Sequence, residues 1–300
     1  GTLSFIQGGI LAGHATPLMT GVLLFLYAYG TGKAALMPIH RWLPNAMVAP
    51  TPVSALLHAV AVVKTGVFTI VKVVVYIFGI DHLSSTGFHI YLAYIAGGTI
   101  VLSSLVAMQQ DNLKARLAYS TISQLSYIVL GAALANAHGI LGAGLHIAMH
   151  AFGKITLFFC AGAIMVALHK TEISNMRGIG RQMPFTMAAF VIGSLSIIGV
   201  PPLGGSWSKW YLALGAADTS HLLLVGVLML SSLLNIAYLL PIPARAFFSK
   251  ATGDDGHHGE GLHEAPLFCL IPLCLTALGC VFLFFFTDPI YQLLAPIVQP

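Results

Sequence analysis

The feature that most constrains the fold is a succession of apolar runs, each long enough to cross a lipid bilayer as a helix of roughly 20 residues. The runs lie at about 17–39, 51–80, 88–108, 117–135, 139–168, 185–217, 221–248 and 266–287. Only 7% of the 300 residues are charged, whereas soluble domains carry about 25%. The sequence therefore predicts one all-α membrane domain over 1–300, a polytopic bundle of about eight transmembrane spans. We expect 1–16 and 289–300 to flank it at the surface.

Positive charge follows the same division of the chain. Eight of the 13 Lys and Arg lie between runs or at their ends: Arg41, Lys114, Arg116, Lys170, Arg177, Arg181, Arg245 and Lys250. With eight spans, all of them fall on one side of the membrane, and the positive-inside rule makes that side cytoplasmic. We therefore expect an integral protein of a bacterial-type inner membrane. Both termini would lie outside, and the polar segment 249–265 would be a cytoplasmic loop.

The other five lysines lie inside apolar runs, where a charge costs at least about 2.5–3.5 kcal/mol. Lys72 is close to the outer end of its run, so its amine can extend toward water. Lys33, Lys64, Lys154 and Lys209 lie deeper, and we expect them to be functional. None of the nine acidic residues falls in the middle of a run. The deep lysines thus have no deep carboxylate in this chain.

Two runs contain helix-breaking residues next to a lysine. Gly30 to Gly32 precede Lys33, and the segment 199–205 (GVPPLGG) precedes Lys209. Proline removes a backbone donor and glycine lowers helix propensity, and freed backbone groups persist in a membrane only against protein or water. The pattern predicts two broken helices bordering polar cavities, which is typical of inverted-repeat transporters.

The run at 139–168 carries His146, His150 and Lys154. At 100° per residue these three side chains lie within about 80° of one another, over roughly 12 Å of rise. A zinc site lacks the HExxH glutamate and a third ligand, and structural hydrogen bonding is a second interpretation. We favour a proton relay because imidazole changes charge near neutral pH.

His58 and Lys64 lie in the second run. Six residues apart on a helix, they point about 120° away from each other. Either they line two sides of a buried helix or one of them is structural, and the sequence leaves this open.

The sequence indicates no cofactor and no metal. Its four cysteines, Cys160, Cys269, Cys274 and Cys280, lie in apolar runs without a CxxC motif, so we expect small buried residues rather than iron–sulfur ligands. The histidines of 249–265 could capture a metal, but a solvated loop is the simpler interpretation. The sequence also lacks a basic patch with interleaved aromatic residues, the pattern that would indicate nucleic-acid binding.

Four segments resemble one known family. They are KAALMPIHRWLPNAMVAPTPVSALLH at 33–58, DNLKARLAYSTISQ at 111–124, HIAMHAFGK at 146–154 and SWSKW at 206–210. They are similar to the antiporter-like subunits of respiratory complex I and of the Mrp multisubunit sodium/proton antiporters. Lys64 and the Ser-Lys-Trp of 208–210 (within SWSKW) are most similar to the D-type member of the Mrp antiporters. The resemblance covers nearly the whole chain and implies an inverted-repeat antiporter-like fold.

The resemblance also implies a role for each position. Lys33 would be the lysine of one broken helix and Lys209 that of the other. His58 and Lys64 would be the polar residues of the helix after Lys33, and His146, His150 and Lys154 would belong to a central polar axis. Such subunits usually have about six further upstream helices, one with a glutamate paired to the first lysine. Here we expect either a C-terminal portion or a partner half on a separate polypeptide.

These observations predict translocation of protons, or of protons coupled to sodium, within a complex of several membrane subunits. The alternative is the proton-pumping subunit of a complex I-like NADH:quinone oxidoreductase or of a membrane-bound hydrogenase, with the redox site elsewhere. A di-haem cytochrome using His58, His146 and His150 leaves the lysines unexplained. A scaffold subunit that no longer pumps is a further rival.

Overall fold

The computed structural model describes residues 4–6, 8–249 and 261–298, without the side chains of 58 and 59. The expected loop at 249–265 therefore lies mostly outside the described residues. Regular structure within them is helical apart from one isolated β-bridge between Asn112 and Glu172. The elements are α1 (Pro17–Gly30), η1 (Gly32–Ala34), α2 (Trp42–Asn45), η2 (Ala46–Val48), α3 (Thr51–Ala55), η3 (Leu56–Val60), α4 (Val62–Lys72), η4 (Val73–Phe78), α5 (Ile80–Thr86), α6 (His89–Gln109), α7 (Leu113–Ala133), α8 (Ala137–Leu168), η5 (Ile173–Asn175), α9 (Ile179–Gln182), α10 (Pro184–Ile198), α11 (Gly205–Asp218), α12 (Leu222–Leu239), α13 (Pro241–Phe248), α14 (Leu267–Phe285) and α15 (Asp288–Val298).

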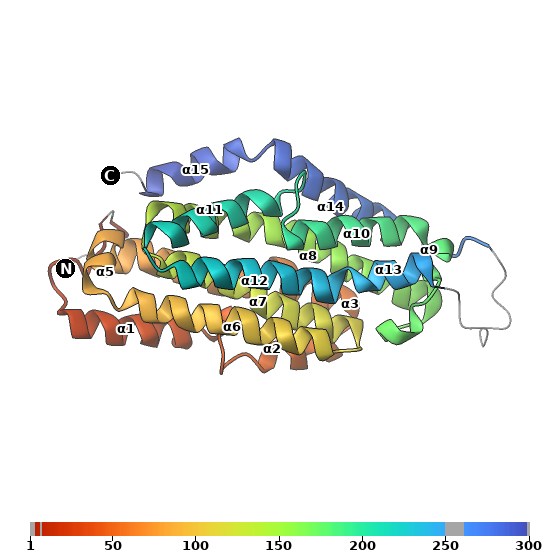
Figure 1. The fold of residues 1–300 in the computed structure, drawn as a ribbon, viewed down its shortest axis with the longest axis horizontal. Helices are drawn as coiled ribbons and strands as arrows, with labels where there is room; N and C mark the ends of the chain where they lie inside the picture. The colour runs from red at the N-terminus through yellow and green to blue at the C-terminus, as the bar shows by residue number, and fades with distance from the viewer. Residues whose placement is uncertain (1–3, 7, 250–260, 299–300) are drawn as a thin grey trace.

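The long helices run side by side along the long axis of the molecule (Figure 1). Helix α8 has 32 residues and packs against α7, α10, α11 and α14. Helix α1 begins and α15 ends toward the same end of the bundle, and α9 and α13 lie at the other end (Figure 1). The arrangement places α8, which carries three of the predicted site residues, inside the bundle.

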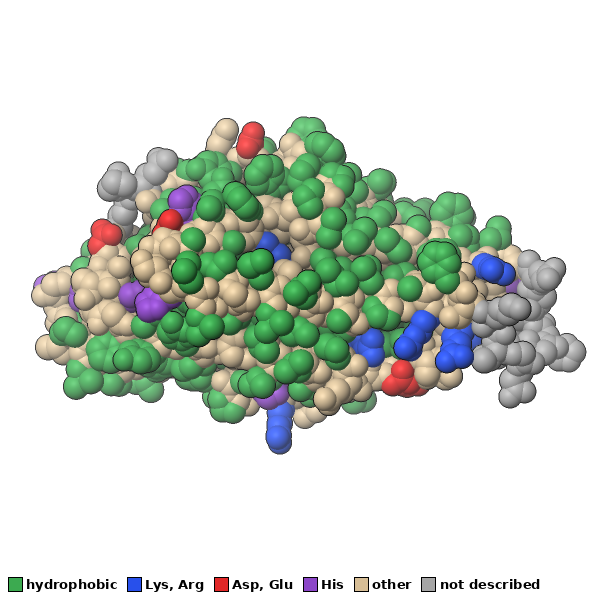
Figure 2. All heavy atoms as spheres, in the orientation of Figure 1, with side chains coloured by type: hydrophobic (Ala, Val, Ile, Leu, Met, Phe, Trp, Pro, Cys, Tyr) green, Lys and Arg blue, Asp and Glu red, His purple; other side chains and the backbone are tan. Residues whose placement is uncertain are grey.

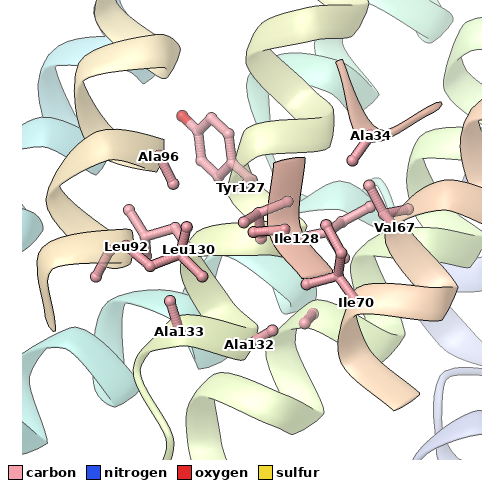
Figure 3. Close-up of a cluster of buried hydrophobic side chains, with 14 of the residues drawn as sticks. Ala34, Val67, Ile70, Leu92, Ala96, Tyr127, Ile128, Leu130, Ala132 and Ala133 are labelled. Carbon is pink, nitrogen blue, oxygen red and sulfur yellow. The ribbon is translucent and has the colours of Figure 1, made fainter. Parts of the chain in front are cut away.

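The largest apolar core joins α4, α6 and α7. Val67, Leu92 and Ile128 have no exposed surface, and Figure 3 shows them with alanines of α6 and α7 between the larger side chains. Small residues let membrane helices approach closely, where packing rather than the hydrophobic effect holds them together. Helix α7 is therefore buried on all sides over most of its length.

Within the described residues, four helices are long and apolar enough to cross a membrane: α6, α8, Leu222–Phe248 and α14. The segment Val62–Phe78 with α5, bent by 85°, would make a fifth. This is fewer than the eight spans that the sequence predicts. Helix α7 carries many hydroxyl side chains, and the expected spans at 17–39 and 185–217 each contain short helices rather than one long one.

The run at 185–217 consists of α10 and α11 with residues 199–204 between them. Gly199 has φ of 89°, a backbone conformation that favours glycine. At Gly205 a Cβ atom would lie 1.9 Å from the carbonyl oxygen of Ser196. Glycine at these positions therefore brings the start of α11 back against the end of α10. The chain also forms α15 at 288–298, where the sequence indicated only a flanking segment.

Candidate functional site

The closest contact between predicted site residues joins α4 to α8. Lys64 Nζ lies 2.6 Å from His150 Nδ1, and the two side chains are 7% and 0% exposed. The other ring nitrogen of His150 is buried and has no hydrogen-bond partner among the described residues. An amine and an imidazole at this distance share a single hydrogen bond, so one proton can lie on either nitrogen.

His146, one turn before His150, uses both of its ring nitrogens. Nδ1 lies 2.8 Å from Ser208 Oγ on α11, and Nε2 lies 3.1 Å from Gln124 Oε1 on α7. The Ser208 hydroxyl is also 3.0 Å from the carbonyl oxygen of Gly205. It can donate to neutral His146, or donate to Gly205 and accept from a protonated ring. These partners therefore satisfy both protonation states of His146.

Lys154, the third polar residue of α8, is fully buried. Its amine donates to Ser120 Oγ at 2.6 Å and to the carbonyl oxygen of Leu117 at 3.2 Å. Ser120 Oγ lies 2.9 Å from the hydroxyl of Tyr238, which donates to Asn235 Oδ1. A chain of hydroxyl groups thus leads from Lys154 across to α12.

Lys209 lies in the second turn of α11, and its half-buried side chain reaches back to the end of α10. Its amine donates to the carbonyl oxygen of Ile198 at 2.9 Å and to Ser232 Oγ at 3.2 Å. Ile198 is the last residue of α10, whose final carbonyl groups have no partner within the helix. The amine also lies 5.0 Å from the ring centroid of Tyr127, and that ring stacks on His146 at 5.5 Å.

A cavity of about 740 Å³ adjoins Lys209 and is otherwise lined mainly by apolar side chains of α11 and α12. Figure 2 shows hydrophobic side chains over most of the visible face and Lys and Arg gathered toward the end that holds α9 and α13. Two of the segments that carry predicted loop cations are joined there, since the Gly178 N–H donates to the carbonyl oxygen of Arg245.

Lys33 is placed differently from the other three deep lysines. It is exposed, on η1, and no described element covers it. At Gly66 of α4 a Cβ atom would lie 2.6 Å from the Lys33 carbonyl carbon, so glycine allows η1 to lie directly on α4. Lys72 is half-buried, with its amine 4.0 Å from the ring centroid of Phe5.

The angle predicted between His58 and Lys64 does not apply. His58 lies in η3, a π-helix, and Ala61 (φ −100°, ψ −73°) separates it from α4. A helix of uniform 100° per residue does not run through both positions. The side chain of His58 lies outside the described part of the structure.

None of the described Asp and Glu residues is buried. Nor do the described residues contain a group of three His, Cys, Asp or Glu side chains that could hold a metal ion. Cys160 and Cys280 are buried, and Cys269 and Cys274 are half-buried. Both ring nitrogens of His146 are engaged in hydrogen bonds, so this histidine offers no free nitrogen for the haem alternative.

Several residues of the site were not singled out from the sequence: Ser120, Gln124, Tyr127, Ser208 and Tyr238. The spacing of Ser120, Gln124 and Tyr127 in the sequence could have indicated the first three. Positions i, i+4 and i+7 share one face of a helix, so α7 presents a polar face in an otherwise buried helix.

The fold and this site define a polytopic helical membrane protein with buried lysines and histidines hydrogen-bonded across neighbouring helices. The family model described as NADH:quinone oxidoreductase/Mrp antiporter, TM matches residues 2–235. The chain belongs to this family, as the sequence motifs predicted.

Curated relatives agree with this assignment. NADH-quinone oxidoreductase subunit N of Desulforudis audaxviator is 34% identical over 295 residues, which is 95% of this chain and 58% of the relative. Subunit L of Mycobacterium tuberculosis is 34% identical over 289 residues, covering 94% of this chain and 44% of the relative. The chain thus spans about half the length of the curated relatives it matches.

Two solved complexes contain chains of similar fold. A chain of the Mrp complex from Dietzia sp. DQ12-45-1b matches with a TM-score of 0.82 and 22% identity, covering 97% of this chain and 60% of that one. A chain of the membrane-bound sulfane sulfur reductase, an archaeal respiratory membrane complex, matches with a TM-score of 0.82 and 28% identity, covering 96% and 58%. The chain thus has the fold of this antiporter-like family, and the proteins it resembles are named as parts of membrane complexes.

Proposed function

We propose that this chain carries part of a proton pathway through a multisubunit membrane complex. The observation that carries the proposal is the buried hydrogen bond between Lys64 and His150. Two basic groups that share one proton away from bulk water can receive a proton on one side and release it on the other. Structural hydrogen bonding alone would be met at lower cost by neutral side chains, because buried charges are expensive in a membrane.

In this proposal, His146 connects the two ends of the site. Its ring lies against that of His150, with centroids 5.9 Å apart, but no hydrogen bond joins the two rings, so in this proposal a water molecule completes the step. The unpartnered Nε2 of His150 is the atom that such a water would contact. On its other side His146 touches Ser208, the residue before Lys209. The path then runs Lys64, His150, His146, Lys209.

Lys154 would serve as a branch from this path. Its amine is joined to Ser120, Tyr238 and Asn235 by hydroxyl and amide groups. Hydroxyl groups can donate and accept at once, so they can pass a proton when they reorient. We assign no role to His58.

Lys33 would meet a carboxylate supplied by another segment or subunit. Its exposure and the absence of a buried acid among the described residues support this assignment. The same absence favours protons over sodium as the ion carried here, since hard cations are held by oxygen ligands that usually include carboxylates. If the complex couples protons to sodium, we expect the sodium ligands elsewhere.

We further propose eight spans, counting α1 with η1, α3 to η4, and α10 with α11 as one interrupted span each. The end of the bundle that holds α9 and α13, the cation-rich end, would face the cytoplasm. Both termini would lie outside, in a bacterial-type inner membrane. The driving reaction belongs to partner subunits. The chain is compatible with an Mrp-type antiporter, which the motifs favour, and with a complex I-like or hydrogenase complex.

The test is proton flux in liposomes that contain the assembled complex. Lys64→Met removes the shared proton site with little change in side-chain length, and we expect flux to fall on the order of 100-fold, the usual contribution of a positioned proton-transfer group. Lys72→Met is the matched control, because Lys72 lies on the same helix and contacts Phe5 rather than the path. Equal flux for wild type and an assembled Lys64→Met complex would refute the proposal.

A further inference from the structure

A second cavity, separate from the proton path, opens at the cation-rich end of the bundle. It measures about 610 Å³ and lies between residues 48–52, the last turns of α8 and the first turns of α14. Its walls are mainly apolar and include Phe158, Phe159, Met165 and Phe268. Val48 and Phe268, which border it, are 94% and 92% exposed. Such a hollow suits hydrocarbon rather than a polar solute.

Two lysines stand at one end of this cavity. Lys114 and Lys170 both belong to its lining, and the backbone N–H of Leu113 donates to the carbonyl oxygen of Thr171 at 3.0 Å. Because each lysine is next to a member of that hydrogen-bonded pair, the backbone holds both at the same place. The Lys114 amine donates to the carbonyl oxygen of Ala49 at 2.8 Å, which uses one of its three N–H groups.

Among the described residues, the lining contains two lysines and no Asp or Glu. Two acids lie on the same loops but are engaged elsewhere. Glu172 accepts from Asn112 Nδ2 and Thr171 Oγ1, and Asp111 accepts from the backbone and hydroxyl of Ser174. The described lining of the cavity therefore combines apolar walls with two lysine side chains at one end, while the carboxylates of the same loops accept hydrogen bonds from Asn112 and Ser174, which lie outside the lining.

We propose that this cavity binds an anionic phospholipid, with the phosphate between Lys114 and Lys170 and an acyl chain along the aromatic side chains of α8 and α14. Charge complementarity decides against a zwitterionic lipid, whose ammonium group would be repelled by the two lysines. The position also fits, because basic pockets between transmembrane helices on the cytoplasmic side bind anionic head groups. The site touches none of the proton-path residues, so the proposal does not rest on proton translocation.

The experiment uses the complex that contains this chain, reconstituted in phosphatidylcholine nanodiscs. A minor fraction of the lipid is phosphatidylglycerol with a photoreactive acyl chain, and a parallel sample carries the same group on phosphatidylcholine. Peptide mass spectrometry then measures labelling of segments 158–166 and 268–272. We expect labelling by phosphatidylglycerol to exceed labelling by phosphatidylcholine by about fivefold for each lysine.

The variant Lys114→Gln with Lys170→Gln should abolish this preference. Arg177→Gln with Arg181→Gln is the matched control, since it removes the same charge from two exposed positions, just before α9 and on it, that do not line the cavity. Lys170→Gln alone keeps the hydrogen bond from Lys114 to Ala49, so it should fold even if the double variant does not. Its labelling preference for phosphatidylglycerol should fall about fivefold. Equal labelling by the two lipids, or a preference that survives the double variant, would overturn the proposal.

Discussion

Lys64 and His150 lie 86 positions apart in the sequence and 2.6 Å apart in the structure. Each comes from a different helix, and both side chains are buried. Replacing Lys64 by Arg keeps a positive charge that does not leave the side chain, because guanidinium stays protonated in proteins. We therefore expect an assembled Lys64→Arg complex to lose flux nearly as fully as Lys64→Met. Wild-type flux in the arginine variant would mean that only the charge of Lys64 matters.

Lys209→Met should abolish proton flux and leave assembly nearly intact. Methionine is similar in length, and removing a buried charge tends to relieve a desolvation cost. Lys209→Arg should fail almost as badly, although its guanidinium can still donate to Ile198 and Ser232. The measurement is flux in the reconstituted complex, with subunit content checked on the same sample. An arginine variant with normal flux would show that Lys209 is not a protonation switch.

Ser208→Ala tests whether the hydroxyl group serves both protonation states of His146. Without it, Nδ1 of the protonated ring loses its acceptor, so we expect flux to fall about tenfold, the value of a hydrogen bond to a charged group. Ser206→Ala is the control, because the Ser206 hydroxyl donates only to the Leu203 carbonyl oxygen in the same turn. If both alanine variants lose flux equally, the effect comes from α11 packing and not from His146.

The chain reconstituted alone should show no robust proton flux. Lys33 is exposed and the described residues offer no buried carboxylate, so a part of the path would be missing. The comparison is with the whole complex at equal protein content and the same imposed gradient. Flux from the isolated chain at the rate of the complex would contradict this expectation.

Glu264→Ala should lower the stability of the cation-rich end without touching the proton path. The Glu264 carboxylate accepts from the backbone N–H of Phe185 and Thr186 and from the Thr186 hydroxyl. The two backbone N–H groups lie in the first turn of α10 and have no acceptor within the helix, and a negative charge is also favourable there. Losing their hydrogen bonds to Glu264 should cost about 1 kcal/mol. Thermal unfolding of the complex measures the change. Glu264→Gln, which keeps an acceptor oxygen but no charge, should fall between wild type and alanine.

Sequence patterns predicted the helical class and the polar stripe on α8, because the spacing of His146, His150 and Lys154 is a local property of one helix. They did not predict that Lys64 meets His150 or that Lys154 meets Ser120, since such pairs depend on how distant helices pack. The uniform helix assumed for His58 and Lys64 failed at the π-helix η3, which has no clear sequence signature. The sequence placed Lys33 as deep as Lys209, yet Lys33 is exposed, whereas Lys209 is half-buried and its amine donates to groups of α10 and α12.

Gly66 has a mechanical consequence. With no side chain between them, the backbones of η1 and α4 touch, so neither can shift without displacing the other. Lys64 lies two residues before that contact. A partner that attracts or releases Lys33 therefore pulls on the helix that sets the distance between Lys64 and His150. Charge arriving at one face of the chain would in this way change the rate of proton exchange between Lys64 and His150, without any direct contact between Lys33 and that pair.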